Sequence, residues 1–256
     1  MSWRFLLAPA GVVALAVPAG AWPADVMHGL SRDARRLLPR TLAQLLAERE
    51  SQIHEGLERF PAELARSLAA DLAAGRLSPP TLAALDSEAA RVVELLREGH
   101  VGEGLVRLGV LLRVPADPSD PVLGAGPRGY PPGVVREYYA FVDQSLEKMP
   151  VVLDDAAALE LTRPQLPAYW QGLLERSRGE SGVIRGELYR DGRAVDHRTL
   201  DFRSPVFGVA SLAYSRAVTS IAATWLALWR EARGDTTRMP APRRVRPSER
   251  PSPVHP

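Results

Sequence analysis

The sequence predicts a mostly α-helical protein, a multi-helix bundle with one small β-hairpin. Three observations predict it. Leucine and valine recur at helical spacing through most of the 256 residues, and prolines and glycines stand between these runs, where helices begin and end. A hairpin signal occurs at Asp191-Gly192, between two short runs with strand-like composition. A chain of this length can bury a sizeable core, so we expect one domain of roughly 200 residues.

Residues 1–21 are expected to be a secretory signal peptide. Arg4 supplies a positive charge, residues 5–18 form a short apolar run, and Ala19-Gly20-Ala21 fits a cleavage site between small residues. Cleavage there makes Trp22 the first residue. An uncleaved anchor is the alternative, but the apolar run is shorter than the roughly 20 residues that span a bilayer. We therefore expect an exported protein, periplasmic or extracellular, with no later membrane span.

The first half of the domain is expected to contain four amphipathic helices. In each of them, leucines recur three or four residues apart, and a proline or glycine marks the boundary. Gly75 follows one of these runs at the position that favours a left-handed C-cap. The expected helices are Ser31–Glu50 with an interruption at Pro39, Ile53–Phe60, Ala62–Ala74 and Thr81–Glu98.

A central helix is expected from Gly104 onward. Its leucines and valines cover most of the helical circumference, which places it in the middle of the bundle. Arg113 lies inside this apolar pattern and needs a partner, because a buried charge is costly unless it is paired. Asp117 follows four residues later. From Asp117 to Gly133 the sequence is rich in proline, glycine and aspartate and predicts a long loop, in which Asp117 and Asp120 could simply cap the turn.

The second half is expected to hold three helices and the hairpin, followed by a tail. The helices are Val134–Met149, one opened by Arg163-Pro164-Gln165, and a last helix from about Val209 to Arg233 with a wide apolar face that includes Leu212, Trp225 and Trp229. The hairpin strands are Val183–Tyr189 and Ala194–Phe202. These elements define a domain at 22–236, and residues 237–256, rich in proline, arginine and serine, are expected to be disordered.

Composition and motifs exclude several functions. With 32 basic and 30 acidic residues, the net charge of +2 does not indicate a nucleic-acid partner. The absence of cysteine excludes disulfides, thiolate metal sites and a cysteine nucleophile. The chain has no G-x-S-x-G, no phosphate-binding glycine loop and no H-E-x-x-H. His54 and His197 are expected to be exposed side chains and not metal ligands.

The order of the remaining chemical groups resembles the zinc-dependent phospholipase C family and its single-strand-specific nuclease relatives. These are exported, mostly helical hydrolases with a cluster of three zinc ions. Their N-terminal tryptophan binds metal, a central helix carries H-x-x-x-D-x-x-x-P-x-H, and a late helix carries H-x-x-x-D or H-x-x-x-E. Residues i and i+4 share a helix face, so each pair can hold one ion. The resemblance implies a phospholipase C type bundle.

Four residues of this sequence match the family pattern. Trp22 takes the place of the N-terminal tryptophan if the signal peptide is cleaved, and His28 corresponds to the first histidine ligand with one extra residue between them. Asp117 and Pro121 match the central motif. The resemblance therefore implies that Trp22, His28 and Asp117 are the metal ligands that remain, with zinc as the metal of an active protein.

Other positions depart from the pattern. Arg113 and Leu123 stand at the two histidines of the central motif, and Arg216 and Ser220 at the His/Asp pair of the late helix. A guanidinium remains cationic and cannot donate a lone pair to zinc. We hypothesise that the cluster has been lost, and that Arg113 and Arg216 satisfy the remaining acidic residues or bind an anion.

Two function classes follow from the resemblance. The first is a non-catalytic or anion-binding exported protein with a degenerate metal site, which is the interpretation we favour. The alternative is a metal-dependent phosphodiester hydrolase with a reduced zinc site, which would act on phospholipid or another phosphodiester. If arginines line the former metal pocket, they suit a phosphate or carboxylate group.

Overall fold

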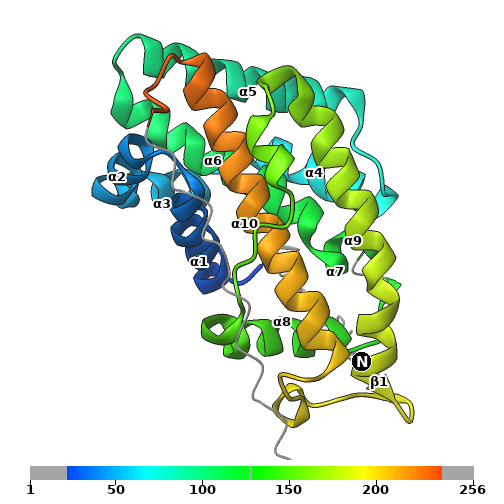
Figure 1. Cartoon of the computed structure of the whole chain (residues 1–256). Coiled ribbons are helices and arrows are strands. Elements are labelled where there is room, and N and C mark those ends of the chain that lie inside the picture. Colours follow the sequence, from blue (N-terminus) through cyan, green and yellow to red (C-terminus); the bar gives the residue numbers. More distant parts are fainter. Residues whose placement is uncertain (1–21, 127–128, 238–256) are drawn as a thin grey trace, which may run out of the picture.

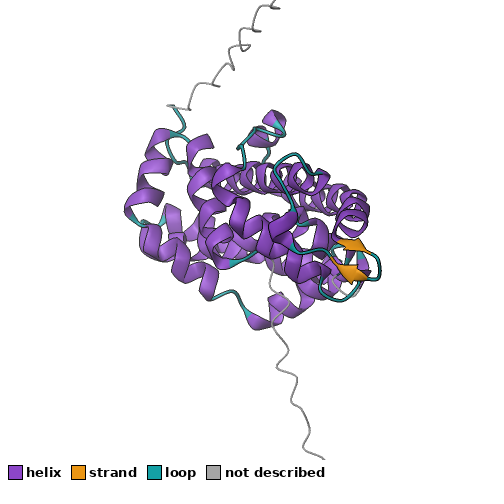
Figure 2. Cartoon of the chain, turned by 90° about the horizontal axis from the view of Figure 1, so that it is seen from below, coloured by secondary structure: helices purple, strands orange, loops and turns teal. Residues whose placement is uncertain are grey.

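A computed structural model describes residues 22–126 and 129–237, so the predicted signal peptide and most of the predicted tail lie outside the described residues. The described chain is a helical bundle with one two-stranded antiparallel sheet, as the sequence predicts (Figure 2). Its α-helices are α1 (Ala24–Ala34), α2 (Arg40–Glu48), α3 (Glu50–Glu58), α4 (Ala62–Ala74), α5 (Pro79–Arg97), α6 (Val101–Ser119), α7 (Pro121–Ala125), α8 (Val134–Ser145), α9 (Leu166–Leu188) and α10 (Pro205–Glu231).

Helix α10 lies across the middle of the molecule, with α9, α6 and α1 packed against it (Figure 1). Val218, Ile221 and Trp225 are buried in its core face, and the Trp225 indole donates a hydrogen bond to the Leu108 carbonyl of α6, 3.1 Å away. Leu212, which we expected in the same face, is instead 41% exposed. The apolar face is therefore interrupted near the start of the helix.

The expectation that no later segment has the length and composition of a membrane span was wrong for α10. It is long and apolar enough to cross a membrane, and 72% of the qualifying window is buried inside the structure. A helix surrounded by other helices in a bundle is apolar on all sides because little water reaches it. A membrane-spanning helix is apolar for the same reason. The position of α10 in the bundle accounts for its composition.

Helices α3 and α6 pack at very short distance through glycines. A Cβ atom added at Gly56 would lie 1.8 Å from the Val106 carbonyl oxygen, and one added at Gly109 would lie 2.1 Å from the Ile53 carbonyl oxygen. Only glycine at these two positions lets the helix backbones touch. This contact fixes α6 against the N-terminal part of the bundle.

The prediction that the central helix ends in a Pro/Asp loop from Asp117 was wrong. Helix α6 continues to Ser119, with Pro115 and Pro118 inside it, and α7 follows at once. A proline inside a helix removes a hydrogen-bond donor and usually costs about 3 kcal/mol or more. Side-chain hydroxyls bond other carbonyls of this last part of the helix: Ser119 donates to the Pro115 carbonyl, and Ser177 of α9 donates to the Pro118 carbonyl at 2.7 Å.

The hairpin turn was predicted correctly, but its strands were not. Asp191 and Gly192 have positive φ angles of 52° and 78°, as a tight hairpin turn requires, and join β1 (Tyr189–Arg190) to β2 (Arg193–Ala194). The expected strand Val183–Tyr189 is almost entirely the last part of α9, because Ile184 and Leu188 lie four residues apart on one buried face. Most of the expected second strand, Ala194–Phe202, is irregular with a short 3-10 turn.

Boundaries in the N-terminal half follow the capping signals closely. Helix α4 has the predicted limits, and Gly75 caps it in the left-handed conformation with φ 75°. The expected helix Ser31–Glu50 is divided into the end of α1, a 3-10 turn, α2 and the first residue of α3, because Pro39 places Leu38, the residue before it, in extended backbone. The bends between these short helices bring α1 against α10 and α3 against α6.

Candidate functional site

The predicted partners Arg113 and Asp117 form an ion pair one turn apart on α6. Their Nη2 and Oδ2 atoms are 3.2 Å apart, and the Arg113 guanidinium also lies over the Phe60 ring, 4.9 Å from its centroid. The side chain of Asp117 is 3% exposed and that of Arg113 is 22% exposed. The arginine therefore stands between the surface and a fully buried carboxylate and neutralises its charge.

Asp120 brings a second carboxylate into this buried region. It caps α7 by accepting the Val122 N–H at 2.8 Å, and its other oxygen accepts the Tyr139 hydroxyl at 2.7 Å. Burial raises the pKa of Asp120 to about 7, although the Tyr139 hydrogen bond opposes this. Burial also raises the pKa of Asp117 to about 6 against the effect of Arg113. Two neighbouring carboxyl groups whose pKa values lie close to neutral pH can share a proton or bind a cation.

One oxygen of this pair has no partner. Among the described residues, Asp117 Oδ1 and the Tyr138 hydroxyl are both buried without a hydrogen bond. A buried carboxylate oxygen without a donor is costly while it is charged, which agrees with the raised pKa of Asp117. Asp117 Oδ1 can therefore still accept a hydrogen bond or bind a cation.

Arg216 forms a separate ion-pair network between α9, α10 and the segment before η4 (Ala156–Glu160). Its two terminal nitrogens donate to the two oxygens of Glu180, at 2.9 Å and 3.1 Å, and its Nε lies 3.6 Å from Asp154. Arg216 is 4% exposed. The charge of its guanidinium is thus met by two carboxylates, and no described ion pair joins Arg216 to Asp117.

Trp22 and His28, the other predicted ligands, lie in different surroundings. Trp22 is buried, and its indole nitrogen donates to the Ala116 carbonyl at 3.1 Å, which places it beside Asp117 in the chain. His28 instead stacks on His54 of α3, with ring centroids 4.0 Å apart. Burial, and next the neighbouring His28, lower the pKa of His54. No described hydrogen bond or ion pair connects His28 with Asp117.

A small pocket borders the Arg216 network. It has a volume of about 240 Å³ and is lined by Pro150, Val152, Asp154, Ser211, Leu212 and Ser215. Val152 and Leu212 are unusually exposed for large apolar side chains, at 58% and 41%. The volume is below the range of about 300–1,000 Å³ that is common for small-molecule sites, so the pocket fits a single short apolar group.

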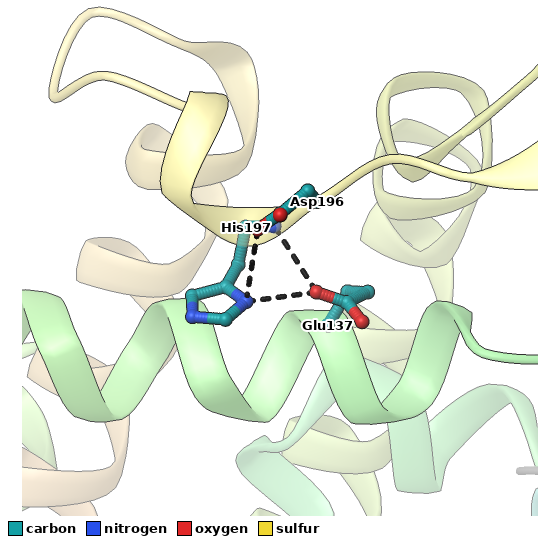
Figure 3. A group of neighbouring side chains, drawn as sticks. All are labelled: Glu137, Asp196 and His197. Atoms are coloured by element: carbon teal, nitrogen blue, oxygen red, sulfur yellow. Dashed lines mark hydrogen bonds and ion pairs between the residues drawn. The ribbon is translucent and has the colours of Figure 1, made fainter.

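A second polar centre, which the sequence did not indicate, joins α8 to the segment after the hairpin. Glu137, Asp196 and His197 each offer one ligand atom, and these atoms all lie within 4.8 Å of one another (Figure 3). His197, expected to be exposed, has only 24% of its side chain exposed. Glu137 and His197 are 60 residues apart, so no local spacing could have revealed the group.

Hydrogen bonds hold both carboxylates of this centre in the ionised form. The His197 ring and backbone N–H donate to Glu137, which lowers the pKa of Glu137 to about 2. The Arg198 side chain and backbone N–H donate to Asp196 and lower its pKa to about 2.

Comparison of the chain with family models, characterised proteins and solved structures finds no match.

Proposed function

We propose that the protein is an exported, non-catalytic relative of the zinc-dependent phospholipases C, in which arginine–carboxylate pairs replace metal ions. The mostly helical bundle agrees with this proposal in its coarse features. Arg113 and Arg216 stand at two of the positions at which the family pattern has histidine ligands, and Leu123 stands at another. Each guanidinium contacts a carboxylate in the folded chain.

The observation that carries the proposal is the environment of Arg216. This side chain is nearly inaccessible, and three of its nitrogens face the carboxylates of Glu180 and Asp154. A guanidinium offers no lone pair to a metal, and its positive charge repels a cation placed near the same carboxylates. Arg216 therefore already pairs with the acidic groups that could otherwise bind zinc, and Arg176, 4.0 Å from Asp154, supplies a second positive charge there.

The same contacts favour a non-catalytic role over anion binding. An anion at Arg216, which is nearly inaccessible, would have to displace Glu180 and would leave that carboxylate without its partner. The pocket between Val152 and Leu212 offers a different contact point, because its exposed apolar side chains can receive a short apolar group. The protein could therefore bind a partner at this pocket while the ion pairs of Arg113 and Arg216 stay intact.

One observation favours the alternative, a phosphodiester hydrolase with a reduced zinc site. Asp117 Oδ1 is buried without a partner, and Trp22 lies next to it through the Ala116 carbonyl. Zinc would give this oxygen a partner and could activate a water for attack on a phosphodiester. Against this alternative, Arg113 already occupies the other oxygen of Asp117, and His28 faces His54.

Turnover and metal content test the proposal. The exported protein and its Asp117→Asn variant would be assayed with a chromogenic phosphodiester and with phosphatidylcholine vesicles, with zinc and with chelator. We expect no turnover above the uncatalysed rate and the same zinc content in both proteins. Asp143→Asn, a change at an exposed aspartate of α8, is the matched control. Turnover that chelator and Asp117→Asn both abolish, while the control keeps it, would establish the hydrolase.

A further inference from the structure

Three side chains from two distant segments converge where α8 meets the turn that follows the hairpin. Glu137 belongs to the first turn of α8, His197 begins the 3-10 turn η6 (His197–Thr199), and Asp196 caps that turn (Figure 3). His197 Nδ1 lies 2.8 Å from Glu137 Oε2 and 3.6 Å from Asp196 Oδ1. One imidazole nitrogen and two carboxylate oxygens therefore face a common point.

The distances are close to those of a tetrahedral metal site. Nitrogen and oxygen ligands about 2.0–2.1 Å from zinc lie about 3.3 Å from each other. The distance between His197 Nδ1 and Asp196 Oδ1 already fits, at 3.6 Å. The distance between His197 Nδ1 and Glu137 Oε2 must increase by about half an ångström, which a small rotation of either side chain supplies. The ligand oxygens of Glu137 and Asp196 lie within 4.8 Å of each other.

Neighbouring arginines hold both carboxylates. Arg136 donates to Glu137 Oε1, the oxygen that does not contact His197, and such outer hydrogen bonds fix the orientation of ligands in metal sites. Arg198 donates to Asp196 Oδ1 through its Nε and its backbone N–H and to Oδ2 through Nη2, so its side chain competes with a metal for Oδ1. Both arginine side chains are more than 70% exposed, so solvent screens their repulsion of a bound cation.

The group is open to solvent on one side. The side-chain exposures of Glu137, His197 and Asp196 are 11%, 24% and 44%, so the site is supported by α8 and accessible from the Asp196 side. An ion held by three protein ligands would take water as its fourth ligand. It would also tie α8 to the irregular segment between the hairpin and α10, which has few backbone hydrogen bonds.

We propose that Glu137, Asp196 and His197 form a binding site for a divalent transition metal, with zinc as the preferred ion. The ligand set of one imidazole and two carboxylates suits zinc better than the all-oxygen environment that magnesium prefers. On binding, Nδ1 of His197 donates its lone pair to the metal, and the ring proton moves to Nε2. This site is independent of Asp117, so it does not depend on the proposed function.

Zinc titration of the full exported protein tests the site. We expect one zinc per chain by calorimetry, no measurable magnesium binding, and at least about tenfold weaker zinc binding in His197→Ala and in Glu137→Gln. His100→Ala removes an exposed histidine that also lies near a carboxylate, and it is the matched control. Asp117→Asn should bind zinc within about twofold of the wild type, which separates this site from the centre on α6.

A fifth variant distinguishes a metal ligand from a structural ion pair. Arg198→Gln removes a competing cation from Asp196, while the backbone N–H at position 198 still orients the carboxylate. Zinc binding should tighten about three- to tenfold. Cobalt(II) bound to the wild type should show the intense visible absorption of a four-coordinate site, a readout that needs no variant. Absent zinc binding at millimolar concentration, or unchanged binding in His197→Ala and Glu137→Gln, would overturn the proposal.

Discussion

Replacing Asp120 by asparagine should change how the stability of the protein depends on pH. The carboxyl group of Asp120 is completely buried, and its donors include the Tyr139 hydroxyl and the backbone N–H groups of Val122 and Leu123. Asparagine has nearly the same shape and is an equally good N-cap, and Tyr139 can accept from its amide. The substitution therefore removes the titratable group and keeps the packing and the cap.

The expected change in the free energy of unfolding follows from the pKa of Asp120, which burial raises from 3.8 to about 7. A raised carboxyl pKa means that the folded state holds the proton longer than the unfolded state. The stability it contributes is present below pH 4 and is lost as the pH rises from about 4 to about 7. At about 1.4 kcal/mol per pKa unit, the loss is on the order of 4 kcal/mol. Asp117, with its pKa near 6, adds a smaller loss in the same direction.

Urea unfolding of the wild type and Asp120→Asn at pH 4.5 and pH 8 measures this effect. The wild type should lose a few kcal/mol between the two pH values, and the variant should lose clearly less, so that it is the more stable protein at pH 8. Asp143→Asn, at an exposed position of α8, should behave as the wild type. Equal pH dependence in the wild type and Asp120→Asn would refute the assignment of a buried, protonated Asp120.

Two further predictions concern the packing of α6 and the pairing of α10. Gly109→Ala should destabilise the protein by several kcal/mol because its Cβ would clash with the Ile53 carbonyl, whereas Gly179→Ala, with open space around it, should stabilise α9 by about 0.5–1 kcal/mol. Thermal unfolding checks both, and equal effects would contradict the close packing. Arg216→Met should cost about 3 kcal/mol by leaving Glu180 unpaired, and adding Glu180→Met should restore much of that loss. A double variant no more stable than Arg216→Met would argue against the pairing.

The local sequence predicted those elements whose limits depend on neighbouring residues. Pro39 divides the first helical region, Gly75 ends α4, and Asp191-Gly192 forms the hairpin turn. Each of these residues acts through its own backbone preference, which is the same in any fold. Prediction failed at residues 183–188, where apolar side chains suit a strand and a helix equally well, and α9 continues through them.

The candidate site was predicted only where its partners are close in sequence. Arg113 and Asp117 are four residues apart on one helix, so their ion pair could be expected from spacing. The partners of Arg216, Glu180 and Asp154, lie on other elements and could not be identified from its surroundings in the chain. The meeting of Glu137 with His197 depends on how the hairpin folds back over α8.

By itself, the sequence determined the helical class, the limits of α4 and the turn of the hairpin, because helical periodicity, caps and turn residues act over a few positions. Only the tertiary structure decided that α6 passes through Pro115 and Pro118. Near these prolines, the carbonyls of Ala116 and Pro118 accept hydrogen bonds from Trp22 and Ser177, which come from distant parts of the chain. Tertiary packing likewise decided the partner of each buried charge, because a charge is satisfied by whatever the fold places beside it and not by its neighbours in sequence.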